Sequence, residues 1–425
     1  MTIKFENAKS FAKDMDGKDS LARFRDKFCF PELRPGEPYL YFCGNSLGLQ
    51  PKTTKKMINE ELEDWAKFGV EGHFEAKRPW VAYHEYLTEM MAKVVGAKSE
   101  EVVCMNSLTV NLHLMMVSFY RPEGQRRKIL IEGGAFPSDQ YAVASQAKFH
   151  GLDPKEDVLE LLPRDGEAIL RTEDILSYLD EHGSEIALVM LGGVNYLTGQ
   201  AYDMRAITNK GHEKGCLVGF DLAHGAGNLA LELHDWNVDF AVWCSYKYLN
   251  SGPGGIAAAF VHESHLGKDM PRFEGWWGHN KDRRFKMEPD FEGIPSVEAW
   301  QLSNPPIFQL ASLLASLEIF EEAGIKELRE KSKTLTSYLE FLVEDTFGSR
   351  ELVITPRNVD ERGAQLSFKI PKGGKDVLKD LRNRGVICDF REPNIIRAAP
   401  APLYNSFEDV FNFVSILKEC VDGVS

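Results

Sequence analysis

A lysine at the end of an apolar strand is the residue in this sequence best suited to covalent chemistry. Lys247 follows the apolar segment 238–244 and precedes a glycine-rich turn. Its aromatic neighbours Trp243, Tyr246 and Tyr248 would strip water from an ammonium with no obvious ion partner. A desolvated lysine amine is suited to Schiff-base formation. The alternative is an ordinary surface lysine at a strand end.

Asp221 and His224 stand at the end of the preceding apolar strand. The 26 positions from Asp221 to Lys247 suit a single crossover connection, which would bring both side chains to the ligand-binding edge of a parallel sheet. A carboxylate that faces a pyridine nitrogen keeps the ring protonated, and a protonated ring lets pyridoxal phosphate act as an electron sink. The alternatives are a helix N-cap for Asp221 and a hydrogen-bonded structural histidine for His224.

Two strand-to-helix turns offer groups that could bind a phosphate and a planar ring. Residues 106–109 open an apolar helix, where free backbone N–H groups and hydroxyls form a ready anion site. Residues 136–139 open a second helix and present the aromatic face of Phe136 for stacking. The alternatives are simple capping by Asn106 or Ser107 and an ordinary proline-led helix start.

Two glycine-rich segments imitate nucleotide-binding motifs. Gly225, Gly227 and Ala230 match a dinucleotide fingerprint, but Asp221 and His224 separate the strand from the glycines, and no acidic residue clearly ends the next strand. The turn at 252–255 lacks the Lys-Ser/Thr pair of a P-loop. A nicotinamide oxidoreductase stays an alternative that rests on this incomplete motif.

Composition narrows the function classes further. The 425 residues contain 50 Lys and Arg against 64 Asp and Glu, and the net charge of −14 disfavours nucleic-acid and anionic-membrane partners. Seven cysteines without a CxxC pair or zinc spacing predict a reduced cytoplasmic protein with no metal site. No apolar run approaches the length of a membrane span.

Alternating helical and short apolar segments predict an α/β domain with a mostly parallel sheet flanked by helices. Helices are expected at 51–67 and 79–95, and strands at 102–105, 128–131, 158–162, 186–191, 216–221 and 238–244. After a proline-rich break, two long helices, strands at 352–355, 364–370 and 385–389, and a closing helix from Phe407 predict a smaller α+β domain. We expect an N-terminal segment (1–50) packed on the small domain, a large domain (51–305) and the small domain (306–425).

Motifs spread over nearly the whole chain resemble those of kynureninase, a fold-type I pyridoxal-phosphate enzyme of the aminotransferase class V type. They are YFCGNSLGLQP (41–51), EGHF and KRPW (71–80), FPSD (136–139), GFDLAHGAGN (219–228), WCSYKYLNSGPGG (243–255), GWWGH (275–279), LSNPP (302–306) and IRAAPAPLYNSF (396–407). Several separate motifs in the same order are far more specific than one. The resemblance implies pyridoxal 5′-phosphate as the cofactor.

The resemblance also implies roles for individual residues. Lys247 would form the Schiff base, Asp221 would face the pyridine nitrogen, and the Tyr246 phenol would bind phosphate and donate a proton. The cofactor site would further include Leu108, Thr109, Phe136, Ser138, Asp139, His224 and, across a homodimer interface, Trp276 and Asn304. Substrate would be bound by Ser46, His73, Asn304 and Arg397, with Arg397 clamping the α-carboxylate. Read alone, these substrate-side residues and Trp276 would be surface, turn or core residues.

One position departs from the family pattern, since Gly192 stands where many relatives carry a hydroxyl near the cofactor. The implied reaction is hydrolysis of the Cβ–Cγ bond of L-kynurenine or 3-hydroxy-L-kynurenine to an anthranilate and L-alanine, within tryptophan catabolism and pyridine nucleotide biosynthesis. Two alternatives stay open. One is a cysteine desulfurase-like lyase, which needs a nucleophilic cysteine on a mobile loop, and the other is a catalytically silent interaction protein on the same fold.

Overall fold

A seven-stranded mixed sheet forms the centre of the larger part of the chain. The computed structural model describes residues 3–349 and 351–424. In spatial order the strands are β6 (Val102–Cys104), β12 (Ala257–Val261), β11 (Phe240–Cys244), β10 (Leu217–Asp221), β9 (Ile186–Gly192), β7 (Lys128–Glu132) and β8 (Val158–Leu161). The strands from β11 to β8 run parallel to one another, whereas β12 runs antiparallel to both β11 and β6. The predicted α/β fold with a mostly parallel sheet is confirmed.

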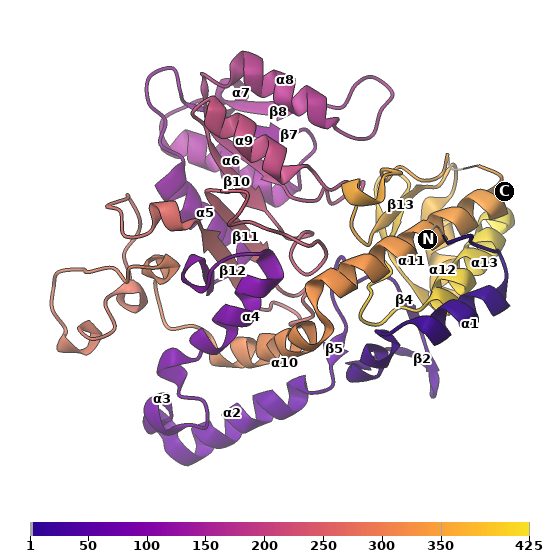
Figure 1. Cartoon of the computed structure of the whole chain (residues 1–425), viewed down its shortest axis with the longest axis horizontal. Coiled ribbons are helices and arrows are strands. Elements are labelled where there is room, and N and C mark those ends of the chain that lie inside the picture. The colour runs from indigo at the N-terminus through magenta and orange to yellow at the C-terminus, as the bar shows by residue number, and fades with distance from the viewer. Residues whose placement is uncertain (1–2, 350, 425) are drawn as a thin grey trace.

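Helices cover both faces of this sheet (Figure 1). On one face, α5 (Leu108–Phe119) and α6 (Pro137–Phe149) share a hydrophobic core with Phe240 and Val242 of β11. On the other face, Ala241 and Trp243 of the same strand share a core with four helices. These are α4 (Glu85–Val95), α8 (Thr172–His182), α9 (Met204–Glu213) and α10 (Ile307–Ala323). Because successive side chains of β11 enter different cores, the strand is apolar throughout instead of alternating.

A three-stranded antiparallel sheet organises the C-terminal part, in the order β13 (Leu366–Lys369), β16 (Ile395–Ala398) and β15 (Asp389–Arg391). Three helices share a separate hydrophobic core with it, α11 (Ile325–Phe347), α12 (Gly374–Asn383) and α13 (Phe407–Val424). N-terminal α1 (Lys9–Lys18) packs on α13, and β4 (Leu40–Tyr41) pairs in parallel with β14 (Val386–Ile387). α10 packs against α2 (Thr54–Phe68) and α4. The domain boundaries at residues 50 and 305 stay a prediction.

Two predicted strands of the C-terminal part differ from the structure. Segment 352–355 forms a single bridge, between Val353 and Phe368. The ladder does not extend because the Thr355 hydroxyl accepts the backbone N–H of Ser367 at 2.9 Å and the next residue is a proline, which has no N–H. The strand predicted at 385–389 divides into β14 and β15, which pair with different partners.

Shorter elements complete the chain. They are α3 (Gly72–Glu75), α7 (Pro154–Asp157), β1 (Phe28–Cys29), β2 (Glu32–Arg34), β3 (Glu37–Pro38) and β5 (Gln50–Pro51). Over residues 3–349 and 351–424, none of the helices combines the length and the apolar composition needed to cross a membrane.

The carboxyl ends of the parallel strands meet at one edge of the large sheet. Glu132 ends β7, Gly192 ends β9 and Asp221 ends β10, with Gly192 directly paired to Asp221. Lys247 follows the end of β11 by three residues. α5 and α6 each begin just after a strand that points to the same edge. The fold therefore converges strand ends and helix starts on one place, which is where open α/β sheets bind ligands.

Candidate active site

A pocket at this edge brings most of the predicted cofactor residues together. It contains about 550 Å³ of space free of protein atoms, its open mouth included. The predicted residues that line it are Leu108, Thr109, Phe136, Ser138, Asp139, Asp221, His224, Tyr246 and Lys247. The wall is completed by Glu132, Gly192, Val194, Tyr196 and Ala223. Residues more than a hundred positions apart in the sequence thus surround one cavity.

Lys247 projects into the pocket between a histidine and an aromatic ring. Its Nζ lies 3.0 Å from Nε2 of His224 and 5.9 Å from the centre of the Phe136 ring. His224 is buried, and burial together with the positive charge of Lys247 lowers the pKa of its imidazole well below the usual value. The neutral imidazole can accept a hydrogen bond from the lysine. His224 therefore holds the Lys247 side chain in place.

Two buried carboxyl groups face each other beside the lysine. A hydrogen bond joins the side chains of Asp139 and Asp221, and Oδ1 of Asp221 also accepts the N–H of Ala223 at 2.7 Å. Burial raises the pKa of both carboxyls, and the adjacent charge of Asp221 raises that of Asp139 further. Oδ1 of Asp139 is buried and makes no hydrogen bond within the described part of the chain. A cationic group placed against this pair would favour the charged form of both carboxyls.

Glu132 is a third buried carboxyl group, and it occupies the space beside Gly192. Its oxygens accept the N–H of Gly192 at 3.1 and 3.2 Å. Burial raises the pKa of Glu132 to about 7, with a smaller contribution from the charge of Asp221. A Cβ atom on residue 192 would lie only 2.8 Å from Oε1 of Glu132. The hydroxyl missing from position 192 is therefore replaced, in space, by a carboxyl group from the neighbouring strand.

The starts of α5 and α6, where an anion site is predicted, lie next to each other. The Thr109 and Ser138 hydroxyls lie 2.8 Å apart and join the first turns of the two helices. Ser107 occupies the N-cap position of α5, but its side chain makes no capping hydrogen bond. Asn106 donates instead to the side chain of Asn111 at 3.0 Å. The simple capping alternative is therefore not what the structure shows for Ser107, and the N–H groups of the first turn stay available to an anion.

Arg397 lies behind the pocket wall with its guanidinium already engaged. Its Nε donates to Oδ1 of Asp389 at 2.6 Å, its Nη1 donates to the carbonyl of Tyr196 at 2.6 Å, and its Nη2 reaches the Ser46 hydroxyl at 3.2 Å. A second, shorter contact joins Nη2 to Asp389. Burial acts to raise the pKa of Asp389, but the hydrogen bonds and charge of Arg397 outweigh it and hold that pKa below the usual value. Arg397 and Ser46 are thus brought together, one residue away from the pocket.

Tyr246 and the turn after it are held by the N-terminal segment. The Tyr246 carbonyl accepts the N–H of Gly48 at 2.8 Å. A Cβ on residue 48 would lie 2.3 Å from the Lys247 carbonyl oxygen and 2.8 Å from Cα of Asn250, so only glycine allows this approach. Burial also raises the pKa of the Tyr246 phenol, which keeps its proton.

Besides Ser46 and Arg397, three further predicted residues do not line this pocket within one chain. His73 contacts the carbonyl of Val70 and the ring of Trp80. Trp276 donates to the carbonyl of Arg284 at 3.0 Å and is 41% exposed, and Asn304 is also exposed. None of the three lines the pocket of the described chain.

Sequence reasoning missed Glu132, Asp389 and Tyr196. Glu132 carries a usable signal, since it ends an apolar strand just as Asp221 does and two glycines follow it. Asp389 and Tyr196 carry none, because their importance depends on which strands and loops pack around Arg397.

Comparisons with known proteins agree with this geometry. A family model described as the kynureninase C-terminal domain matches residues 328–417. The kynureninase of Myxococcus xanthus (strain DK1622) is 62% identical over 415 residues, 97% of this chain and 97% of that protein. The kynureninase of Homo sapiens is 48% identical and covers 97% of this chain and 93% of its own length.

Solved structures resemble the chain at the level of the fold. The cysteine desulfurase CsdA of Escherichia coli superposes with a TM-score of 0.76 at 19% identity, covering 96% of this chain and 99% of its own. A form of the enzyme C-DES with glycine linked to its PLP cofactor superposes with a TM-score of 0.75 at 18% identity, covering 93% and 99%. The sequence relatives decide the family, because their similarity extends over nearly the whole chain. The chain belongs to the kynureninase family.

Proposed function

We propose that this chain hydrolyses the Cβ–Cγ bond of L-kynurenine or 3-hydroxy-L-kynurenine, releasing anthranilate or 3-hydroxyanthranilate and L-alanine, with pyridoxal 5′-phosphate as cofactor. The observation that carries the proposal is one pocket that combines Lys247, the Asp139–Asp221 pair and the uncapped start of α5. Family membership supplies the substrate class. Tryptophan catabolism and pyridine nucleotide biosynthesis are the pathways in which this reaction would serve.

The residues of the pocket fit pyridoxal phosphate in charge and shape. The N–H groups of the first turn of α5, with the Thr109 and Ser138 hydroxyls, would hold the phosphate. The half-exposed Phe136 ring would stack on the pyridine ring. Asp139, whose Oδ1 lacks a partner within the described chain, would with Asp221 balance a protonated pyridine nitrogen. The bound cofactor supplies a cationic ring that accepts the electrons of a bond broken at the substrate Cα.

The chain's own residues would then move protons and orient the substrate. Lys247 would remove the proton from Cα as a general base, with His224 positioning its amine. The Tyr246 phenol, which keeps its proton, would donate to Cβ when the aromatic acid has left. Arg397 would bind the α-carboxylate and Ser46 would support it, which fixes the Cα–H bond for transfer.

The alternatives receive less support from the site. A cysteine desulfurase-like reaction needs a nucleophilic thiol, and none of the seven cysteines lines the lysine pocket. Cys43 lies close to Arg397 instead of the lysine. Burial and the charge of Asp389 raise the pKa of the Cys43 thiol to about 12, so it is a poor nucleophile at neutral pH. A nicotinamide enzyme would use the glycines of its fingerprint to approach the cofactor. Here Gly225 and Gly227 lie beyond the first turn after β10 and do not line the pocket, whereas Asp221 and Ala223 do. A silent binding protein would have no need for a lysine held by a neutral histidine.

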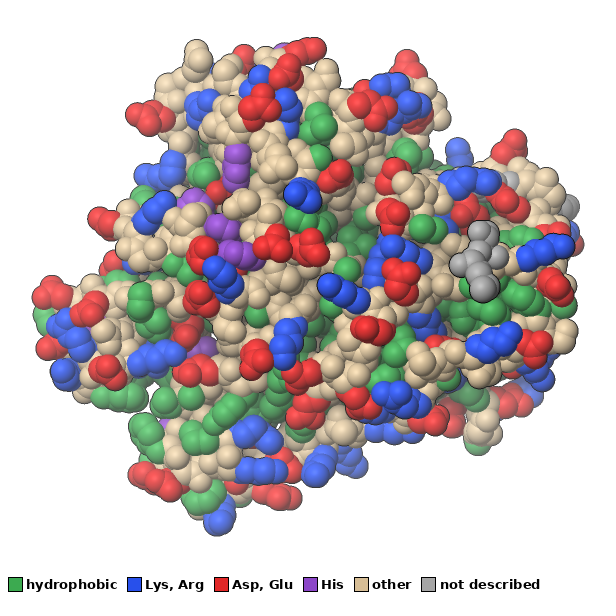
Figure 2. Space-filling view, viewed as in Figure 1, with side chains coloured by type: hydrophobic (Ala, Val, Ile, Leu, Met, Phe, Trp, Pro, Cys, Tyr) green, Lys and Arg blue, Asp and Glu red, His purple; other side chains and the backbone are tan. Residues whose placement is uncertain are grey.

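A homodimer with shared sites is supported by an exposed apolar patch. The patch consists of Trp65, Phe74, Trp276, Phe285 and Phe308, each 39 to 58% exposed. Figure 2 shows hydrophobic side chains gathered on the lower left of the molecule, the region of α2 and α3 in Figure 1. His73 directly precedes Phe74 of this patch, and Asn304 is four positions before Phe308. His73, Trp276 and Asn304 are thus on or close to the surface where a second copy would contribute them. The cysteine pattern supports a cytoplasmic location.

The assignment is tested with purified protein reconstituted with pyridoxal phosphate. Wild type should show the yellow absorbance of lysine-bound cofactor and release equal amounts of L-alanine and fluorescent anthranilate. Lys247→Ala should lose that absorbance and lower the rate by roughly a thousandfold or more, because the Schiff-base amine and the general base are one group. Lys379→Ala, at an exposed position of α12 away from the pocket, is the control and should match wild type. A cofactor-loaded wild type that releases neither product from either kynurenine would overturn the proposal.

A further inference from the structure

A second cluster of functional side chains lies at the opposite edge of the large sheet. Glu101 precedes β6, His262 follows β12, and His234 belongs to the loop between β10 and β11. Residue 102 of β6 is close to the end of β12, since Val102 pairs with Phe260. β12 runs antiparallel to β11, so its carboxyl end lies where the parallel strands begin. This edge is remote from the lysine pocket, and nothing in the proposed reaction uses it.

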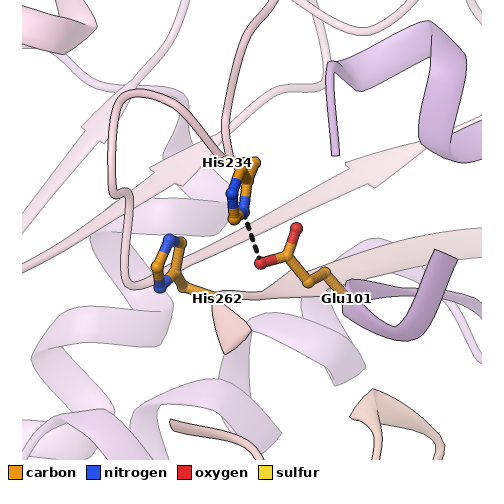
Figure 3. A group of neighbouring side chains, drawn as sticks. All are labelled: Glu101, His234 and His262. Carbon is orange, nitrogen blue, oxygen red and sulfur yellow. Dashed lines mark hydrogen bonds and ion pairs between the residues drawn. The ribbon is translucent and has the colours of Figure 1, made fainter. Parts of the chain in front are cut away.

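Three potential metal ligands converge there. One ligand atom from each of Glu101, His234 and His262 lies within 4.8 Å of the other two. Nδ1 of His234 lies 2.9 Å from Oε1 of Glu101, and the two imidazole rings stack at 5.1 Å with an angle of 12° between their planes. Figure 3 shows the three side chains meeting from separate segments, with the His262 ring turned toward the other two.

Glu101 is held rigidly by its surroundings. Its Oε2 accepts the N–H of Lys98 at 2.8 Å, and its Oε1 accepts the N–H of Glu263 at 2.8 Å. The carboxylate is fully buried, so its position is set by the backbone of two segments. Second-sphere hydrogen bonds of this kind orient the ligands of metal sites.

His262 contributes the observation that hydrogen bonding does not explain. It is 93% buried, and its Nε2 has no hydrogen-bond partner in the described part of the chain. Its Nδ1 lies 2.9 Å from the Ser264 hydroxyl and 3.1 Å from the Ser264 N–H. The Ser264 N–H donates to Nδ1, so without a bound metal the ring proton is on Nε2. Metal binding would move that proton to Nδ1, where it can be donated to the Ser264 hydroxyl, and would leave the Nε2 lone pair facing the cluster. A buried ring nitrogen with no partner is costly unless something binds it.

In two other acidic and histidine clusters of the described chain, the carboxylates already face a lysine or two histidines. His84, Glu85 and Glu298 also lie close together, but the Lys281 ammonium contacts both carboxylates at 2.9 Å and takes the place of a cation. Asp239 accepts from His212 at 2.8 Å and from His265 at 2.7 Å, which uses both of its oxygens. The nearest cation to Glu101, Lys98, pairs instead with Glu263.

We propose that Glu101, His234 and His262 form a binding site for a divalent transition-metal ion of the zinc class, remote from the cofactor pocket. Two imidazoles and one carboxylate are a ligand set that zinc accepts. Tetrahedral zinc places its ligand atoms about 3.4 Å apart, so side-chain shifts of about 1 Å would close the site. His234 is about a quarter exposed, which leaves water access to the fourth position. The ion would tie the start of β6, the loop before β11 and the end of β12 together.

The test uses the holoenzyme after treatment with a chelator and dialysis, titrated with Zn²⁺ alone in a calorimeter. Wild type should bind one ion per chain, melt at a higher temperature with the ion, and bind more weakly as the pH falls and the histidines protonate. Co²⁺ in the same site should show visible ligand-field absorbance separate from that of the cofactor. His234→Gln should weaken binding roughly tenfold or more and abolish the Co²⁺ absorbance.

His234→Gln is the primary variant because His234 is partly exposed and glutamine can still donate to Glu101. His262→Gln is the second variant, accepted only where its circular dichroism matches wild type. His212→Gln is the matched control, since it removes a neighbouring histidine outside the site and should leave the affinity unchanged. Two results would overturn the proposal: wild type that binds no stoichiometric Zn²⁺, or His234→Gln that binds it with wild-type affinity.

Discussion

The ionisation of Glu132 should have a direct effect on the free energy of unfolding. Its pKa is raised from 4.5 to about 7 by burial. A carboxyl with a higher pKa in the folded chain binds protons more tightly when folded, so the free energy of unfolding falls as the pH rises from about 4.5 through about 7. Glu132→Gln removes this dependence. We expect the variant to gain about 3 kcal/mol relative to wild type across that window, measured by denaturant unfolding of the cofactor-free protein.

The other buried carboxyls titrate in both proteins, so the quantity to compare is the difference between wild type and variant at each pH. Glu160→Gln, at an exposed position on the neighbouring strand β8, should show no such trend. A difference between wild type and Glu132→Gln that stays constant from pH 4.5 to 7.5 would show that Glu132 is charged throughout.

Arg397 is a residue whose role depends on the planar fork of its guanidinium. Lysine keeps the charge but cannot bridge Asp389, Tyr196 and a substrate carboxylate at once. We expect Arg397→Lys to lower kcat/KM about a hundredfold, mainly through a higher KM, because an ammonium cannot hold Asp389 and Tyr196 and still donate to the substrate carboxylate. Steady-state kinetics with kynurenine measure both constants.

Arg25→Lys is the matched control for that variant. Arg25 also bridges a carboxylate with two nitrogens, that of Asp409, but it lies outside the pocket. It should lose some stability and keep its KM. If Arg397→Lys lowers kcat alone, Arg397 does not bind the substrate.

At the scale of elements, Gly48, just before β5, packs against the turn that carries Lys247 and supports it. Gly48→Ala would push a methyl group into the Lys247 carbonyl and the Asn250 backbone. We expect a loss of about 1 to 3 kcal/mol in stability and a clear loss of cofactor absorbance per mole of protein. Thermal unfolding and the absorbance spectrum measure these. Gly17→Ala, where a Cβ meets nothing within 4 Å, should leave both unchanged or slightly improved.

Elements also explain which parts of the site could be predicted from the sequence. Asp221 ends β10 and Lys247 follows the end of the adjacent parallel strand β11, so strand topology alone places them at one edge. Thr109 and Ser138 begin helices that follow strands, so the same rule reaches them. All six predicted strands between residues 100 and 244 end within one residue of the observed end, because buried strands are continuous apolar runs.

The rest of the site depends on contacts between distant parts of the chain. The Arg397–Asp389 pair joins β16 to β15, and its link to Ser46 crosses about 350 positions. The metal-ligand cluster combines Glu101, His234 and His262, whose spacing resembles no local motif. Periodicity and motif spacing describe neighbours in sequence, so they cannot predict contacts between residues that are far apart in the chain.

At the scale of the whole molecule, the apolar patch predicts the quaternary structure. Phe285 contacts Phe74 and Trp276 within the patch and is half exposed. Placing a charge there would bury it in the dimer interface, so we expect Phe285→Glu to sediment as a monomer and to lose activity. Phe149→Glu, on exposed α6 outside the patch, should sediment as wild type does.

A mixing experiment distinguishes a shared site from simple association. Lys247→Ala lacks the amine in its own pocket, and Trp276→Ala would lack the residue lent to its partner. Random re-pairing of the two inactive proteins should restore about a quarter of wild-type activity, because each mixed dimer has one intact site. No recovery, with dimers present, would mean that each chain completes its own site.

The position of the N-terminal segment has a consequence for how the protein is made. Asp16 of α1 accepts the N–H groups of Phe407 and Glu408 at 2.7 and 3.0 Å, β4 pairs with β14, and Gly48 supports the Lys247 turn. At roughly 5 to 20 residues per second, a ribosome needs roughly 20 to 70 seconds to travel from residue 50 to residue 407. Asp16 must therefore wait without its partners until the start of α13 has been synthesised. The packing of α1 on α13 is thus completed late in synthesis, and agents that shield residues 16–48 as they emerge should improve the yield of active enzyme.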